Sequence, residues 1–232
     1  MASIDQEYLN DLDMYLNGDD SSEPEEEIPF EEGLKGNVPV EEIRDTEQAL
    51  LYLVIDKSTS MYYNGLENAI KQGLEDVKRV VNGSEEVKCI QTAMTFFGAT
   101  LDMRPFQYGE CIDTSYSANE TKTRLYDAVV ESCKNMISQY DKLKPTAKVK
   151  GTMLIFTDGG ENGSEQYSLS DVQHYLDELT SREDIVYIVA AFKGKEVNEE
   201  QLAKDFKTEL KPIEDDHKLR RLMQFVSKRA MG

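Results

Sequence analysis

From residue 48 onward, short apolar runs alternate with stretches in which apolar residues recur every three or four positions. Apolar runs span 49–55, 151–156 and 185–192, residues 87–97 are predicted to form a further strand between the first two, and a shorter last strand is expected near 209–213. Helical spacing is found over 66–81, 125–140, 169–179, 198–207 and 216–229. Unbroken apolar runs are typical of strands that are covered on both faces of a parallel sheet.

This alternation predicts the fold class. Strands that alternate with amphipathic helices indicate an α/β protein with a Rossmann-like, doubly wound, mostly parallel central sheet and helices on both faces. One segment departs from the parallel pattern, because only Gly98 and Ala99 separate the second predicted strand from 100–106. So short a connection predicts an antiparallel hairpin strand at an edge of the sheet. Residues 107–122 form a polar loop.

The first 47 residues have a different composition. Residues 1–46 contain fifteen Asp and Glu against two Lys and Arg, a net charge of −13 out of −19 for the whole chain. High charge, several prolines and few apolar residues are typical of disorder. We therefore divide the chain into an acidic, largely disordered tail (1–47) and a folded domain (48–232).

One short segment of the tail is amphipathic. Within residues 7–16, the apolar residues at positions 8, 9, 12, 15 and 16 fall on one face of a helix. Two interpretations fit this pattern. The segment is either a transient helix in a disordered tail or an acidic motif that docks on a partner.

Charge and cysteine content exclude several classes of protein. A net charge of −19 argues against nucleic-acid binding, which needs clustered Lys and Arg. Three cysteines without a CxxC pair fit a reducing compartment. The first residues lack the pattern of a signal peptide, and no apolar run approaches the ~20 residues that cross a bilayer. We expect a cytoplasmic protein without a membrane partner.

The candidate chemistry lies where the predicted strands end. The first strand ends on Asp56, with Ser58 and Ser60 at alternate positions after it, and the third is followed by Asp158. Thr123 precedes the helix that begins near residue 125. In a parallel sheet these positions meet at the carboxyl edge. Their oxygen atoms suit Mg²⁺, and Mn²⁺ as well, so we predict a metal site formed by these five residues.

The charges of this predicted site indicate a function. Asp56 and Asp158 neutralise a divalent ion, whereas Ser58, Ser60 and Thr123 contribute only neutral hydroxyl oxygens. An ion with few charged ligands still attracts a further anion. One of its coordination positions also stays open for that anion. We therefore expect the site to bind an Asp or Glu side chain of a protein partner.

These motifs resemble those of a known family. Residues 48–230 are similar to a von Willebrand factor A (vWA) domain, in which Asp56-x-Ser58-x-Ser60, Thr123 and Asp158 match the metal-ion-dependent adhesion site. The segment that begins Thr123-Arg-Leu-Tyr-Asp-Ala-Val resembles the family's helix start, and Phe156-Thr-Asp-Gly resembles its strand end. Thr59 departs from the pattern, since relatives often have Gly there.

The resemblance implies a Mg²⁺-binding interaction module and not an enzyme. The chain resembles intracellular vWA domains of prokaryotic or phage-like type, and such members of the family resemble adaptors. An AAA+ ATPase or another protein from the same gene cluster is the partner that this resemblance suggests.

The competing interpretation is a Mg²⁺-dependent, phosphatase-like hydrolase with Asp56 as the nucleophile. Such chemistry needs a second carboxylate two residues later as general acid and base, and Ser58 stands there. The chain also has no GxGxxG, GxxxxGK[ST] or GxSxG motif. His174 and His217 fit surface positions better than catalytic ones. We expect no catalytic residues.

The acidic tail has two interpretations once the metal site is considered. Glu25, Glu26 or Glu27 could occupy the open metal position in the same or a neighbouring molecule. The simpler alternative is that the tail only raises solubility.

Overall fold

The computed structural model describes most of the domain and one helix of the tail. The described residues are 6–17, 46–83, 89–108, 112–158, 160–182, 184–192, 199–208, 211–213 and 215–231. The disorder that we predict for the tail falls mainly on residues 18–45, which lie outside this set.

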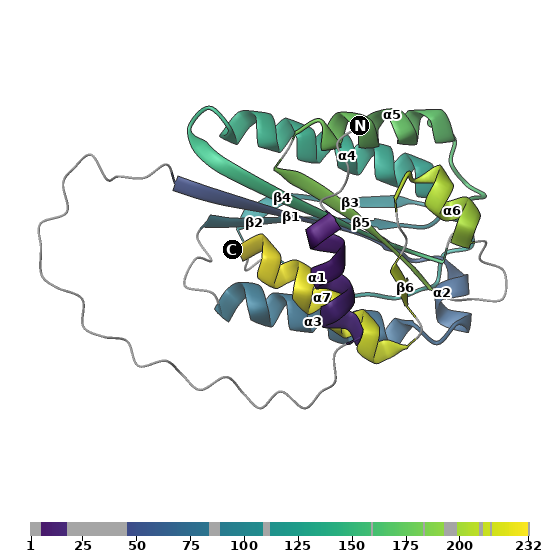
Figure 1. The fold of residues 1–232 in the computed structure, drawn as a ribbon. Coiled ribbons are helices and arrows are strands. Elements are labelled where there is room, and N and C mark those ends of the chain that lie inside the picture. Colours follow the sequence, from purple (N-terminus) through teal and green to yellow (C-terminus); the bar gives the residue numbers. More distant parts are fainter. Residues whose placement is uncertain are drawn as a thin grey trace, which may run out of the picture.

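A six-stranded sheet forms the centre of the domain (Figure 1). Its strands, in the spatial order β3-β2-β1-β4-β5-β6, are β3 (Leu101–Tyr108), β2 (Ile90–Phe97), β1 (Thr46–Asp56), β4 (Ala147–Thr157), β5 (Ile185–Phe192) and β6 (Lys211–Ile213). All neighbours pair in parallel except β2 and β3, which pair in antiparallel fashion at one edge. The predicted fold class, with its single antiparallel edge strand, is confirmed.

Helices cover both faces of the sheet (Figure 1). One face packs against α3 (Glu67–Gly83), α7 (Asp216–Met231) and α1 (Gln6–Asn17). The opposite face packs against α4 (Leu125–Leu143), α5 (Leu169–Thr180) and α6 (Glu199–Asp205). A short helix, α2 (Thr59–Tyr63), follows the carboxyl end of β1.

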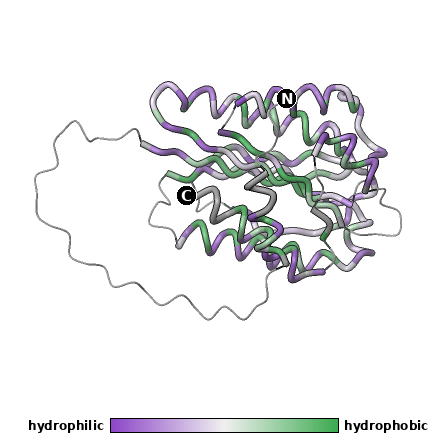
Figure 2. Tube along the Cα trace, in the orientation of Figure 1, coloured by the Kyte–Doolittle hydropathy of each residue, from purple (hydrophilic) through white to green (hydrophobic). Residues whose placement is uncertain are grey.

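The apolar side chains of β1 divide between the two layers of the core. Leu51, Leu53 and Ile55 face the layer of α3 and α7, whereas Leu50, Tyr52 and Val54 face the layer of α4 and α5; all six are 0% exposed. Successive residues of a strand point to opposite faces, so a strand segment that is covered on both faces is mainly apolar. Figure 2 shows the result, with apolar strands between helices that are polar outside.

The amphipathic segment of the tail forms α1, which packs on α7 of the same chain (Figure 1). Leu12 is 0% exposed and Leu16 is buried in the layer of α3 and α7. The Tyr15 ring lies 5.4 Å from the Phe225 ring, and the Arg221 guanidinium lies 5.1 Å from the centre of the Tyr15 ring. Neither sequence interpretation included this packing within the chain.

We expect Leu12→Ala to detach α1. A helix of 12 residues is marginal by itself in water, so its order depends on its packing. Truncating a fully buried leucine costs about 2–5 kcal/mol. Hydrogen exchange should show loss of amide protection in α1 and unchanged protection in β1. Met14→Ala is the matched control, because Met14 lies on the same helix and is 73% exposed. Equal protection of α1 in the two variants would contradict the packing described above.

Candidate metal centre

The two candidate carboxylates lie at the ends of neighbouring strands. Asp56 is the last residue of β1 and Asp158 directly follows β4. These strands pair in parallel, with Ile55 opposite Phe156. Adjacent parallel strands therefore bring both carboxylates to the carboxyl edge of the sheet, where α/β folds bind ligands.

Asp56 is 0% exposed and held by three hydrogen bonds. The backbone N–H of Ser58 donates to its Oδ1 (2.7 Å) and the Thr157 hydroxyl donates to its Oδ2 (3.0 Å). The Tyr116 hydroxyl donates to its main-chain oxygen (2.6 Å). Burial raises the pKa of Asp56 to about 7; the hydrogen bonds from Ser58 and Thr157 oppose this rise and the negative charge of Asp158 adds to it.

Ser58 and Ser60 bring their hydroxyl groups together. The two Oγ atoms are 2.9 Å apart; Ser58 is buried and Ser60 is exposed. Ser58 is extended (φ −63°, ψ 152°) and precedes the first residue of α2, so Ser60 lies in a short helix. Met61 is 0% exposed and anchors this helix to the core.

Thr123 and Asp158 face the same backbone position. A Cβ atom placed on Gly160 would lie 3.5 Å from Asp158 Oδ1 and 3.8 Å from Thr123 Oγ1. The N–H of Gly160 also donates to Asp158 Oδ1 (3.3 Å). Both side chains are more than nine-tenths buried. The structure thus brings Thr123 to the carboxylate that follows β4.

This group of side chains fits a hard divalent cation. Two buried carboxylates repel each other, and within the described part of the chain no Lys, Arg or His nitrogen lies within 4.0 Å of either one. A divalent ion would supply the missing positive charge. No three His, Cys, Asp or Glu of the described residues gather at a common point, so hydroxyl oxygens would complete the ligand set. Such an oxygen-only set suits Mg²⁺ or Mn²⁺.

Glu120 connects the loops around the site. Its N–H donates to the Lys57 oxygen (3.1 Å), and its own main-chain oxygen accepts the N–H and the hydroxyl of Thr59 (2.7 and 2.8 Å). Its carboxylate accepts the Thr100 N–H (2.8 Å) and lies 3.6 Å from the Lys57 ammonium. A Cβ on Gly98 would lie 2.5 Å from the Glu120 Cβ, so only glycine fits there.

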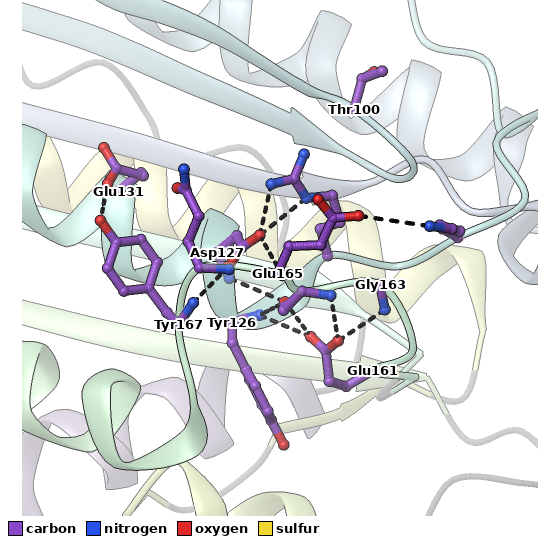
Figure 3. A network of polar contacts seen from close by, with 12 residues as sticks. Thr100, Tyr126, Asp127, Glu131, Glu161, Gly163, Glu165 and Tyr167 are labelled. Atoms are coloured by element: carbon purple, nitrogen blue, oxygen red, sulfur yellow. Dashed lines mark hydrogen bonds and ion pairs between the residues drawn. The ribbon is translucent and has the colours of Figure 1, made fainter.

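A second group of contacts holds the segment after β4 against the start of α4 (Figure 3). Asp127 is 0% exposed and accepts the N–H groups of residues 165, 166 and 167 and the Arg124 guanidinium. Burial by itself would raise the pKa of Asp127, but the hydrogen bonds, led by that from the Glu165 N–H, hold the pKa below its usual value.

Glu161 also connects the segment after β4 to the start of α4 (Figure 3). One oxygen of its carboxylate accepts the Tyr126 N–H (3.0 Å) and the other accepts the N–H groups of Gly163 and Ser164. Thr123 and residue 162 bond reciprocally: the Thr123 N–H donates to the Asn162 side chain (2.9 Å), and the Asn162 N–H donates to the Thr123 main-chain oxygen (3.2 Å). Asp127 and Glu161 therefore fix the position of Thr123 relative to the segment after Asp158.

Comparison with known proteins supports the architecture. No protein-family model matches the sequence, and no curated protein matches it significantly. Solved structures do match. The pilus adhesin SpaC from Lactobacillus rhamnosus GG has a TM-score of 0.63 at 9% identity, over 80% of this chain and 30% of that one. A von Willebrand factor type A protein from Catenulispora acidiphila has a TM-score of 0.58 at 13% identity, over 80% and 43%.

A third similar structure contains a metal. Proximal thread matrix protein 1 from the mussel byssus, solved with a zinc-occupied metal-ion-dependent adhesion site, has a TM-score of 0.58 at 19% identity, over 78% of this chain and 48% of that one. This chain thus spans less than half the length of each of the three proteins. Identities this low establish the fold alone, and the fold is that of vWA domains.

We expect Asp127→Asn to destabilise the protein by about 1.5–3 kcal/mol at pH 7, the usual range for hydrogen bonds to a charged group. Because folding lowers the pKa of Asp127, its stabilising effect is complete above the pKa of the unfolded chain, near 4, and is lost as the pH falls through the folded value. The difference from wild type in urea unfolding should therefore shrink below about pH 4.

Asp102→Asn is the control for this experiment. Asp102 is about half exposed and pairs with Arg104 at the surface (2.9 Å), so its loss should change stability by at most about 0.5 kcal/mol. A difference for Asp127→Asn that is equally small, or that does not depend on pH, would contradict the role assigned to Asp127.

Proposed function

We propose that this chain is a protein-interaction module that binds Mg²⁺, or Mn²⁺, through Asp56, Ser58, Ser60, Thr123 and Asp158. The observation that carries the proposal is the pair of buried carboxylates at adjacent strand ends, with hydroxyl groups beside them and no cationic side chain from the described residues. The vWA-like fold and the metal-bound structure with the same fold add support.

Each residue of the site has a physical role in this proposal. Asp56 and Asp158 balance the charge of the ion, and the buried hydroxyls of Ser58 and Thr123 supply neutral oxygens. Ser60 is exposed and therefore lies toward an approaching partner. The bound ion supplies electrostatic attraction for a carboxylate. The partner is accordingly a protein that presents an Asp or Glu side chain.

The class of partner follows from charge and from the resemblance. The net charge of −19 disfavours nucleic acid. Within the described residues, no helix combines the length and the apolar character needed to cross a bilayer. We propose a cytoplasmic protein partner, with an AAA+ ATPase as one candidate.

Hydrolysis with Asp56 as nucleophile has less support. Its side chain is 0% exposed, so a substrate has no open approach to either carboxylate oxygen, whereas a small ion needs far less room. Ser58 replaces the second carboxylate that this chemistry needs. We propose that the protein is not an enzyme. Phosphatase or ATPase turnover that is lost in Asp56→Ala would contradict this.

The metal site is tested by thermal unfolding with Mg²⁺, with Mn²⁺ and with EDTA. A ligand that binds only the folded state stabilises it by about 2.7 kcal/mol at 100 times its Kd. Asp56→Asn and Asp158→Asn should lose this metal-dependent stabilisation, because each removes half of the negative charge. Thr123→Ala should lose less, since water can replace one neutral oxygen.

The Asp102→Asn variant again serves as control and should respond to Mg²⁺ as the wild type does. If the wild type has the same melting temperature in saturating Mg²⁺ and in EDTA, the metal proposal is wrong. If the stabilisation is present but survives in Asp56→Asn and Asp158→Asn, the ion binds elsewhere, for example in the acidic tail.

A further inference from the structure

Two tyrosines next to the candidate metal centre are exposed. Tyr62 is 59% exposed and Tyr63 is 80% exposed, and both lie on α2 directly after Ser60. Among the described residues, Met14 and Tyr108 are the only other large apolar side chains that are more than half exposed. Met61, between Ser60 and the tyrosines, is fully buried, so the two rings project from an anchored turn. The rings contact each other edge to face, 5.7 Å apart.

The exposed residues around the site are mostly uncharged. We use the name neutral rim for the exposed residues Ser60, Tyr62, Tyr63, Asn119, Thr121 and Asn162. Three segments supply the residues of the neutral rim. They are α2, the segment around Glu120 that bonds to Thr59, and the segment after β4 that bonds to Thr123. The neighbouring exposed charges, Lys122 and Glu165, form an ion pair at 3.7 Å and so cancel.

The acidic groups beneath this rim are already bonded within the fold. Glu67 pairs with Lys71 at 2.6 Å, and Glu120 pairs with Lys57. Glu161 accepts backbone N–H groups. In a chain of net charge −19, the neutral rim therefore carries no net negative charge among the exposed side chains that the structure describes. Complementary potentials favour encounter with such a ligand, and a surface of like charge would repel it.

The composition of the rim also suits protein recognition. Tyrosine offers a large contact area at low cost in conformational entropy, and Ser and Asn offer adaptable hydrogen bonds. Exposed tyrosines are among the side chains that most often dominate the binding energy of an interface. Isolated exposed apolar residues need no explanation, but two in contact beside a candidate binding site do.

We propose that Tyr62 and Tyr63 bind an apolar side chain of the same partner segment whose Asp or Glu reaches the metal ion. This inference rests on the proposed function for the carboxylate and adds the second half of the recognised motif. The tyrosines lie two and three residues after Ser60, within about 5 Å along the helix axis. An extended partner advances about 3.3 Å per residue, so the apolar residue lies within three positions of the acidic one.

The experiment is a selection from a random 12-residue peptide library against the full chain in Mg²⁺, followed by removal of peptides that remain bound in EDTA. We expect the retained peptides to contain an Asp or Glu with an apolar residue within three positions. A synthetic peptide of this kind is then titrated against wild type and against the double variant Tyr62→Ser/Tyr63→Ser. The double variant should bind at least ten-fold more weakly and keep the Mg²⁺-dependent rise in melting temperature.

Tyr108→Ser is the matched control. Tyr108 is 57% exposed, but it is the last residue of β3 and pairs with Gln91 near the start of β2, at the end of the sheet opposite to the candidate metal centre. Its replacement should leave peptide affinity unchanged.

Two results would overturn the inference, and they are distinguishable. If EDTA-sensitive acidic peptides bind the double variant within two-fold of wild type, or lack a nearby apolar residue, the rim plays no part and the proposed function stands. If the selection yields no peptide whose binding needs Mg²⁺, the proposed function fails and the inference fails with it.

Discussion

The burial of two like charges at adjacent strand ends is the constraint on which the site depends. Asp56 and Asp158 come from neighbouring parallel strands, and both are more than nine-tenths buried. Burial of a carboxylate without a cation is costly, which the raised pKa of Asp56 reflects. A cation that binds both is the simplest compensation. The same constraint explains why the remaining oxygens are hydroxyls, since more carboxylates would add repulsion.

The surrounding loops are held by bonds that keep this arrangement in place. Glu120 ties the loop after β1 to the turn between β2 and β3, while Asp127 and Glu161 tie the segment after β4 to the start of α4. All three carboxylates accept backbone N–H groups, so they fix main chain as well as side chains. Loops that are fixed in this way present the neutral rim as one surface, and a preorganised surface loses less entropy on binding.

The parts of the structure that local pattern determines could be predicted from sequence. The final parts of β1 and β4 are apolar because both faces of the sheet are covered there, and the ends of these two apolar runs identified Asp56 and Asp158 as candidate ligands. The hairpin at Gly98 followed from the short connection.

In contrast, α2 is only five residues long and has no periodicity of its own, and its position depends on the burial of Met61. Glu120, Asp127 and Glu161 resemble ordinary polar residues in the sequence, because their roles come from contacts with distant loops. The packing of α1 on α7 was equally invisible, since an amphipathic pattern does not identify the surface that it covers.

The most direct test of the central claim is a Mn²⁺ titration followed by electron paramagnetic resonance, in which the signal of free Mn²⁺ is lost on binding. We expect one site per chain from which Mg²⁺ displaces Mn²⁺, and we expect Asp158→Asn to lose this site. Weak binding of Mn²⁺ to the acidic tail would be the same in wild type and in Asp158→Asn, so it would cancel when the two titrations are compared. Equal titration curves for wild type and Asp158→Asn would contradict the account.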